Sequence, residues 1–435
     1  MKQEWQRWRE YQKRNNFFKV SPKKTTFILL LASFIIFVAA GSPFLDTSNL
    51  TQKLSYTIEE NNIRLIFDEG NIKIEGEALP PLKDKEGDKF VSSLGKNIQV
   101  VYTIDPLLQD KMTELFAKYK VPYGVFVAIS PKTGKVLAMV EHSEGSLSSK
   151  HLALRATYPA ASIFKLITAA AALEKGKVDT DTVINYSGGL YTLTPRNWVD
   201  NPKRDKNKIT LADAMGKSCN VAFAKVALKW LNANDLLGYA EQFGFNKSLD
   251  FEFPVDISHA NVDKTQASIA RTAAGFGDVT LSPLHGVMLA SVIANNGRMI
   301  APRIIEKVIY NGNEIYSFTA KELDECITPD TAYKLKYMML KTVENGTSRH
   351  AFYTRRGDAY LKDIIVGGKT GSLDGDDPPG DYSWFVGMAP LYDPEIAVAV
   401  LVINKPKWQI KAPFVAREGL LAYFNGDRLK MASVN

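Results

Sequence analysis

Strand-like segments lie near both ends of the main body of this sequence, and helix-like segments fill the middle. The strand patterns cover 100–104, 125–130, 135–140, 304–310, 314–318, 364–368, 382–388 and 396–403. Helical patterns dominate residues 162–300, and the pattern at 412–424 indicates a closing helix. The early strands must therefore pair with late ones, which predicts an α/β (α+β) fold whose sheet is built from distant segments around an inserted helical region.

Local signals place some of these elements. Asp105 is a good helix cap, and Pro106 suits the first turn of a helix whose apolar face includes Leu108 and Met112. The turn residues at 131–134 separate two strand patterns and predict a hairpin. A second hairpin is expected at 63–74, with its turn at 68–71. Two prolines at 80–81 and the charged run 83–89 are interpreted as a linker.

The first 45 residues combine a basic tail with an uncharged apolar run. Residues 1–24 hold eight Lys or Arg and two Glu, a net charge of +6; the whole chain is +7, which leaves about +1 for residues 25–435. As a helix, the run 25–45 would extend roughly 31 Å, about the thickness of a bilayer core. We therefore expect a single-pass anchor with the N-terminus in the cytoplasm and the remaining chain outside. The alternative is a cleaved signal peptide, which the long leading region disfavours.

Composition excludes several kinds of function. The body is nearly neutral and has no basic stripe, so we expect no nucleic-acid partner. The chain has two cysteines, Cys219 and Cys326, and five scattered histidines. They offer neither a disulfide framework nor metal-ligand spacing, so we expect unpaired cysteines, no metal and no cofactor. The acidic run 374–381 lacks the spacing of an EF-hand loop and is interpreted as a solvated turn.

Three short motifs carry chemistry: Ser-x-x-Lys, Ser-x-Asn and Lys-Thr-Gly. Each is weak alone, because each recurs: at Ser21, Ser93 and Ser162; at Ser218 and Ser433; and at Lys132 and Lys369. Four of these copies lie where another structure explains them: the basic tail, a segment before a strand, a hairpin turn and the chain end. The copies beginning at Ser162, Ser218 and Lys369 remain.

Ser162 and Lys165 precede an alanine-rich helical stretch. Residues three apart share a helix face, so the hydroxyl and the amine should lie together at a helix N-terminus. Serine becomes a nucleophile when a base takes its proton, and lysine can be that base only if burial or a nearby cation such as Lys369 lowers its pKa. The plain alternative is an ordinary helix start with an exposed lysine.

Ser218 and Asn220 begin another apolar helix, where a hydroxyl and an amide could relay a proton and hold a substrate amide. Taken alone, these residues are better explained as a simple helix cap by Ser218 or Asn220. Lys369, Thr370, Gly371 and Ser372 follow the strand pattern that ends at Gly368. Glycine on an edge strand lets a substrate backbone approach, and Lys369 and Ser372 could meet a carboxylate. An exposed strand with a bulge is the alternative.

Taken together, the three motifs resemble the transpeptidase domain of penicillin-binding proteins, the family that includes serine β-lactamases. The resemblance runs from about residue 99 to 424 and extends to 103–106, 129–135, 171–176, 217–220, 282–284, 293–297 and 384–387. It implies a β-lactamase/transpeptidase-like fold with a central antiparallel sheet, flanking helices and an all-helical subdomain, in a monofunctional, class B-like member. Two departures are Ser372, where the family more often has Thr, and 274–277, where it often has Gly-Gln-Gly.

The resemblance also implies roles. Ser162 would attack the penultimate carbonyl of a D-alanyl-D-alanine stem peptide, with Lys165 as general base. Ser218 would protonate the leaving D-alanine, and Asn220 would hold the substrate or Lys165. The terminal carboxylate would be bound by Lys369, Thr370, Gly371 and Ser372. Backbone N–H groups of Ser162 and Ser372 would form the oxyanion hole. A second stem peptide would resolve the acyl-enzyme, and β-lactams would acylate the same serine as mimics.

These inferences divide the chain into four parts. They are a cytoplasmic basic tail (1–24), a transmembrane anchor (25–45), a short extracytoplasmic stalk or juxtamembrane module (46–98) and a penicillin-binding transpeptidase domain (99–435). The expected location is the inner (cytoplasmic) membrane, with the catalytic domain extracytoplasmic or periplasmic and a membrane glycan polymerase as a partner.

Two other functions stay open at this point. With water as acceptor, the same nucleophile would give a D,D-carboxypeptidase or a β-lactamase. Glu241 is the residue to test as an activator of that water. A protein without activity could instead be an envelope scaffold that recruits partners through its anchor.

Overall fold

A computed structural model describes residues 56–60, 63–68, 71–75, 82, 84–94, 96–144, 151–405 and 409–432. The predicted anchor at 25–45 lies outside these residues. Within the described part, no helix combines the length and the apolar character needed to cross a bilayer.

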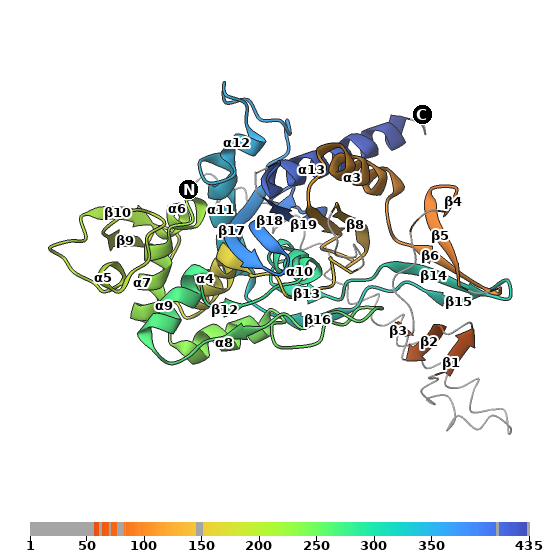
Figure 1. Ribbon diagram of the computed structural model, residues 1–435, viewed down its shortest axis with the longest axis horizontal. Coiled ribbons are helices and arrows are strands. Elements are labelled where there is room, and N and C mark those ends of the chain that lie inside the picture. The colour runs from red at the N-terminus through yellow and green to blue at the C-terminus, as the bar shows by residue number, and fades with distance from the viewer. Residues whose placement is uncertain are drawn as a thin grey trace, which may run out of the picture. The chain divides into compact units, whose positions relative to one another are not determined.

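The main sheet has five antiparallel strands in the order β17-β18-β19-β7-β8 (Figure 1). Their bounds are β7 Tyr123–Ile129, β8 Val136–Ser143, β17 Gly367–Asp376, β18 Pro379–Ala389 and β19 Ile396–Asn404. An early hairpin and a late three-stranded meander meet where β19 pairs with β7. The sheet thus joins distant segments, as the sequence pattern predicts.

Helices cover both faces of this sheet, and alternate residues of each strand explain how. Val125 and Val127 belong to one apolar core, which includes α10 (Pro283–Ala294). Phe126 and Ala128 belong to a second core with α3 (Pro106–Tyr119) and α13 (Ala412–Ala432). Successive side chains of a strand point to opposite faces, so an unbroken apolar strand needs a cover on each side.

Asp105 caps α3 by accepting hydrogen bonds from the amides of Leu107 and Leu108, which confirms the helix cap predicted from the sequence.

A largely helical region inserts between β8 and the late strands. Its elements are η2 Ala161–Phe164, α4 Lys165–Glu174, α5 Pro195–Trp198, α6 Leu211–Gly216, α7 Asn220–Trp230, α8 Ala233–Gln242 and α9 Gln266–Ala274. Two small antiparallel sheets lie among them: β9 (Val183–Tyr186) with β10 (Asn207–Thr210), and β11 (Ala260–Asn261) with β12 (Asp278–Val279). The expected all-helical subdomain is therefore corrected to a mixed one. These strands have two to four residues each, too short for the periodicity of a strand to show in sequence.

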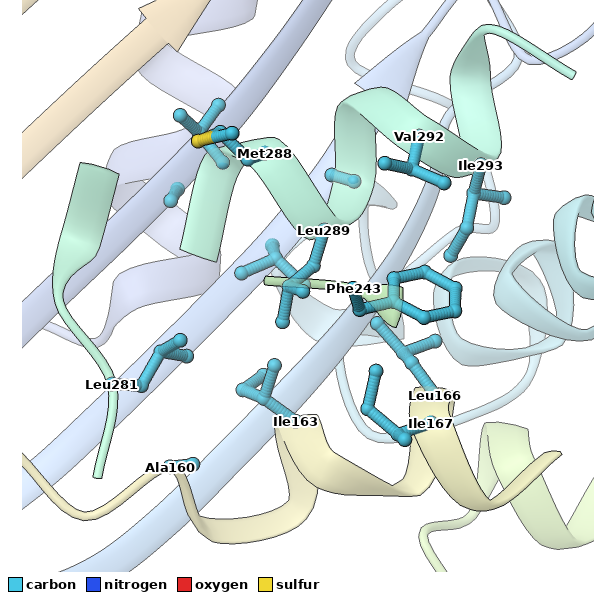
Figure 2. Packing of buried hydrophobic residues seen from close by; sticks show 14 of the residues in the cluster. Ala160, Ile163, Leu166, Ile167, Phe243, Leu281, Met288, Leu289, Val292 and Ile293 are labelled. Carbon is cyan, nitrogen blue, oxygen red and sulfur yellow. The ribbon is translucent and has the colours of Figure 1, made fainter. Parts of the chain in front are cut away.

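Apolar packing fixes the start of α4 against the body. Figure 2 shows Ile163, Leu166 and Ile167 directed toward Leu289, Val292 and Ile293 of α10, with Phe243 beside them. All of these side chains are buried. Burial of each side chain of this size contributes about 1.5–3 kcal/mol, so the segment that bears Ser162 is held firmly.

A second five-stranded sheet, in the order β15-β14-β6-β5-β4, corrects the predicted linker. Its bounds are β4 Asp84–Glu86, β5 Lys89–Leu94, β6 Ile98–Tyr102, β14 Ile305–Tyr310 and β15 Asn313–Ser317. The charged run at 84–89 is a hairpin rather than a linker, because its charged side chains face solvent while the backbone pairs. The expected boundary at 98/99 falls inside β6 of this sheet. The hairpin predicted at 63–74 is present as β2 (Ile63–Asp68) and β3 (Asn71–Glu75), with β1 (Tyr56–Glu60) beside it.

The remaining elements are β13 Arg298–Ile300, β16 Glu322–Glu325, α11 Pro329–Glu344 and α12 Arg349–Phe352. α11 packs against β17, which carries the third motif, and against α6, which ends two residues before Ser218 of the second motif. Cys219 and Cys326 are both buried and free, as expected.

Candidate active site

Ser162 lies in a 3₁₀ turn, and Lys165 is the first residue of α4. The structure thus differs slightly from the expected α-helical start. The spacing still works, because a 3₁₀ turn has three residues per turn and stacks side chains i and i+3. Lys165 Nζ is 2.7 Å from Ser162 Oγ. Ser162 is partly exposed, whereas the Lys165 side chain is fully buried.

The turn at Ser162 is backed by a close backbone approach. Ala161 has φ of 49°, a left-handed conformation that an L-residue adopts only at a cost of about 1–3 kcal/mol. Gly275 lies against it, and a Cβ added there would come within 2.3 Å of the Ala161 carbonyl oxygen. The segment 274–277, which departs from the family pattern, therefore keeps a glycine where the nucleophile turn requires one.

Lys165 has three hydrogen-bond partners and no carboxylate. Its Nζ lies 2.7 Å from Ser162 Oγ, 2.9 Å from Asn220 Oδ1 and 2.6 Å from the Ala274 carbonyl oxygen. Burial without a countercharge lowers the pKa of Lys165 to about 7.

A neutral amine has two N–H donors and one lone pair. The two oxygens of Asn220 and Ala274 can only accept, so they take both N–H groups. The lone pair is then left for the Ser162 hydroxyl, which donates to it. The surroundings of Lys165 thus suit a general base.

Ser218 and Asn220 lie at the start of α7. The Asn220 amide group donates to the Tyr191 carbonyl at 2.8 Å, which fixes its other end, Oδ1, toward Lys165. Ser218 has φ of 54°, so the chain turns sharply before the helix. This turn brings the Ser218 hydroxyl within 3.0 Å of Lys369 Nζ.

Lys369 lies inside β17 rather than after a strand, which corrects the expected strand at 364–368. β17 is the edge strand of the main sheet, so one side of its backbone has no neighbouring strand. Lys369 is fully buried, and its Nζ donates to Ser218 Oγ and to the Thr370 carbonyl at 2.7 Å. Burial and repulsion from Lys165 lower the pKa of Lys369 well below its ordinary value. The sequence predicts the reverse effect, in which the charge of Lys369 lowers the pKa of Lys165. In the structure, burial is the main cause of the lowered pKa of both lysines.

The edge strand approaches the nucleophile turn at Gly371. A Cβ there would meet Ala161 Cβ and Ile163 Cγ1, both at 3.3 Å. Thr370 is half-buried and Ser372 is exposed. The structure thus brings the three motifs together through two hydrogen-bonded groups, Ser162–Lys165–Asn220 and Ser218–Lys369, and through the approach of Gly371 to the nucleophile turn.

Sequence reasoning missed the backbone carbonyls of Ala274 and Tyr191, which hold Lys165 and Asn220. A carbonyl has no side-chain signature, so only the fold reveals such a partner. The acidic run 374–381 forms the end of the β17–β18 hairpin, where Asp377 pairs with Arg155. Among the described residues, no cluster of His, Cys, Asp or Glu could hold a metal ion.

The fold and site define an α+β protein whose serine–lysine pair is held against the edge strand of an antiparallel sheet. The chain belongs to the penicillin binding protein transpeptidase domain family, whose model matches residues 124–417.

Among curated relatives, peptidoglycan D,D-transpeptidase PbpA of Mycobacterium tuberculosis is 27% identical over 69% of this chain and 66% of its own length. Stage V sporulation protein D of Bacillus subtilis is 27% identical over 79% of this chain and 55% of its own length. This chain therefore spans about two thirds or less of the length of these relatives.

Solved structures of penicillin-binding proteins are also similar to this chain. The crystal structure of PBPA from M. tuberculosis is 25% identical, with a TM-score of 0.63 over 74% of this chain and 81% of that one. An imipenem acyl-enzyme complex of penicillin-binding protein A from M. tuberculosis is 26% identical, with a TM-score of 0.61 over 75% of this chain and 79% of that one.

Proposed function

We propose that this protein is a peptidoglycan D,D-transpeptidase that crosslinks stem peptides through an acyl-enzyme on Ser162 and is acylated by β-lactams. One observation carries the proposal: Lys165 is buried without a countercharge, and its lone pair is left for the Ser162 hydroxyl by two acceptor-only oxygens. The relatives support it, since PbpA of M. tuberculosis is named a peptidoglycan D,D-transpeptidase and penicillin-binding protein A from M. tuberculosis has a solved structure as an imipenem acyl-enzyme.

In the acylation step, neutral Lys165 takes the proton of Ser162 as Oγ attacks the penultimate carbonyl of the D-alanyl-D-alanine end. The oxyanion would be stabilised by the backbone N–H groups of Ser162 and Ser372, since η2 and the open edge of β17 face each other there. Ser218, which accepts a hydrogen bond from Lys369, would give its hydroxyl proton to the departing amine of D-alanine and take a proton in turn from protonated Lys165, which returns Lys165 to its neutral form. The terminal carboxylate would lie along Thr370, Gly371 and Ser372, near the buried amine of Lys369.

In the second step, neutral Lys165 takes a proton from the amine of another stem peptide as that amine attacks the ester, and it returns the proton to Ser162 Oγ as the bond between Oγ and the acyl group breaks. Water is the competing acceptor, and rapid hydrolysis needs a group that activates it. Glu241, the residue considered for that role, is exposed on α8, and within the described residues its side chain has no hydrogen bond to Ser162 or Lys165. This favours the amine over water as acceptor.

A fluorescent penicillin tests the reaction. We expect the wild-type protein to be labelled on a denaturing gel, the label to persist for many minutes, and Ser162→Ala to lose it. Label that disappears within minutes would indicate a hydrolase. A wild-type protein without label would indicate a scaffold, and a labelled Ser162→Ala variant would exclude Ser162 as nucleophile. Synthetic stem peptides with and without an acceptor amine then separate crosslinking from carboxypeptidase activity.

We also propose that residues 25–45 anchor the protein in the inner (cytoplasmic) membrane, with the transpeptidase domain outside and a membrane glycan polymerase as partner. The support is the sequence alone: the uncharged run, and the net charge of +6 on residues 1–24, from eight basic and two acidic residues. Alkaline carbonate should leave the full chain in the membrane fraction and release a variant that lacks residues 1–45. Release of the full chain would contradict the anchor. Crosslinking in the membrane would then identify the polymerase.

A further inference from the structure

The hydroxyl of Thr370 has a partner outside the three motifs. Thr347 Oγ1 lies 2.5 Å from Thr370 Oγ1. Thr347 is exposed and Thr370 half-buried, so this pair lies at the open side of β17. Ser372 is two residues further along the strand and shares its face with Thr370. Lys369, in contrast, is fully buried and already donates to Ser218 and to a carbonyl. Among the side chains of this segment, the hydroxyl groups of Thr370 and Ser372 are thus the donors that can reach a ligand directly.

The turn that carries Thr347 is fixed on both sides. The Thr347 amide donates to the Gly216 carbonyl at 3.0 Å. A Cβ at Gly346 would lie 2.1 Å from that same carbonyl oxygen, so only glycine lets the turn lie so close to α6. Buried Ser348 donates its hydroxyl to the Thr342 carbonyl at 2.9 Å. The turn therefore joins the end of α6, two residues before Ser218, to the strand that bears Thr370.

Two hydroxyl groups at this distance share one hydrogen, and the other hydrogen stays free. If Thr370 donates to Thr347, its hydrogen is used, and its oxygen can only accept a hydrogen bond from a ligand. If Thr347 donates to Thr370, the Thr370 hydrogen is free for a ligand. An anionic ligand favours the second arrangement, because a hydrogen bond to an ionised acceptor is roughly twice as strong as a neutral one. In such a chain of two hydroxyl groups, each hydrogen bond also polarises and strengthens the other.

We infer that Thr347 is a positioning residue for substrate: it donates its hydroxyl hydrogen to Thr370 and thereby directs the Thr370 hydroxyl toward the carboxylate of the bound acyl donor. This inference rests on the proposed function, because it assigns the carboxylate to the Thr370 side of the cleft. It adds to the carboxylate site a residue that none of the three motifs contains.

The test compares Thr347→Val, which keeps the shape and removes the hydroxyl, with Thr347→Ser, which keeps the hydroxyl. Each variant is reacted with benzylpenicillin and with its methyl ester, which lacks the carboxylate. The binding constant and the acylation rate constant are measured separately by rapid mixing. We expect Thr347→Val to weaken binding of the acid about five- to tenfold, in line with the loss of one oriented donor. The acylation rate constant and the reaction with the ester should be unchanged, and Thr347→Ser should match the wild type within about twofold.

Three results would overturn the inference while the wild type still reacts normally. They are an unchanged binding constant for the acid in Thr347→Val, an equal weakening for acid and ester, and a defect in Thr347→Ser as large as in Thr347→Val. An equal loss for both ligands would mean that Thr347 only supports the fold of the turn. A wild-type protein that neither ligand acylates would instead be a failure of the proposed function itself.

Discussion

Two buried lysines of this protein have opposite surroundings. Lys165, at the nucleophile, has an amide oxygen, a carbonyl oxygen and a hydroxyl as partners. Lys225, on α7, has two carboxylates: Asp200 Oδ1 at 2.8 Å and Asp205 Oδ2 at 2.6 Å. Lys225 lines a cleft of about 180 Å³ beside β9, with its side chain 4% exposed.

The difference shows what burial does to a lysine. Burial penalises the charged form, and only a countercharge offsets the penalty. At Lys165 nothing offsets it, and burial lowers the pKa to about 7, which suits a base. At the other cleft, burial alone would raise the pKa of Asp205, but hydrogen bonds from Lys225 and the Asn201 amide outweigh it and hold this pKa below its ordinary value. The first lysine is suited to proton transfer; the second ties a loop to α7.

The largest expected effect is on the catalytic lysine. Lys165→Met should lower the acylation rate by a penicillin about a thousandfold or more, since it removes the general base and keeps the side-chain volume. The folded state should survive, because no carboxylate is left unpaired. Stopped-flow acylation measures the rate, and circular dichroism checks the fold. A variant that reacts within tenfold of the wild type would show that another group takes the proton.

Lys225→Met should show the reverse pattern. It leaves Asp205 buried and unpaired, which should reduce the free energy of unfolding by about 3–5 kcal/mol, measured in urea. The protein that remains folded should be acylated at the wild-type rate. The double variant Lys225→Met with Asp205→Asn is the control and should recover part of the loss. Unchanged stability of Lys225→Met, or slower acylation of its folded fraction, would contradict the contrast between the two lysines.

The wild-type pH profile should follow Lys165. Since the base must be neutral, the acylation rate should rise with pH and level off above the pKa of about 7. Well below it the rate should fall about tenfold per pH unit; because Lys165 is already half protonated at pH 7, the fall between pH 7 and pH 5 should be roughly fiftyfold. Benzylpenicillin keeps its charge between pH 5 and pH 7, so the change in acylation rate comes from a titrating group of the protein. A flat profile between pH 5 and pH 7 would mean that Lys165 is not the group that titrates.

The smallest expected effect comes from giving Lys165 a carboxylate partner like those of Lys225. Asn220→Asp places a carboxylate at Lys165 Nζ, as at Lys225, and should raise the pKa of Lys165 by about 1–3, moving the rising limb to higher pH. Asn220→Ala is the control: like Asn220→Asp it loses the bond to the Tyr191 carbonyl, and it removes the partner of Lys165 without adding a charge. The same limb position in both variants would argue against electrostatic control of this base.

Some features of the site are formed by residues that are close together in the chain, and the sequence could therefore predict them. The three-residue spacing of Ser162 and Lys165 places hydroxyl and amine together in either kind of helical turn. Asp105 and Pro106 mark the start of α3 in the same local way. The charged run at 84–89 misled for a related reason: charge describes the exposed side chains of β4 and says nothing about the pairing of its backbone.

Other parts of the site depend on residues far apart in the chain. The Ala274 carbonyl reaches Lys165 across 109 positions of sequence, and Thr347 meets Thr370 from a turn after α11. A backbone carbonyl is common to every residue type, and threonine is an ordinary residue in a turn. Neither could be singled out before the helices and strands were packed together.

The sequence by itself determined the alternation of strand and helix patterns, the order of the three motifs and the local pairing of Ser162 with Lys165, because periodicity and short spacing act over a few residues. Only the tertiary structure decided that Lys165 lacks a carboxylate while Lys225 has two, and that Ser218 meets Lys369. The pKa of a buried group depends on which distant atoms surround it, and packing alone selects those atoms.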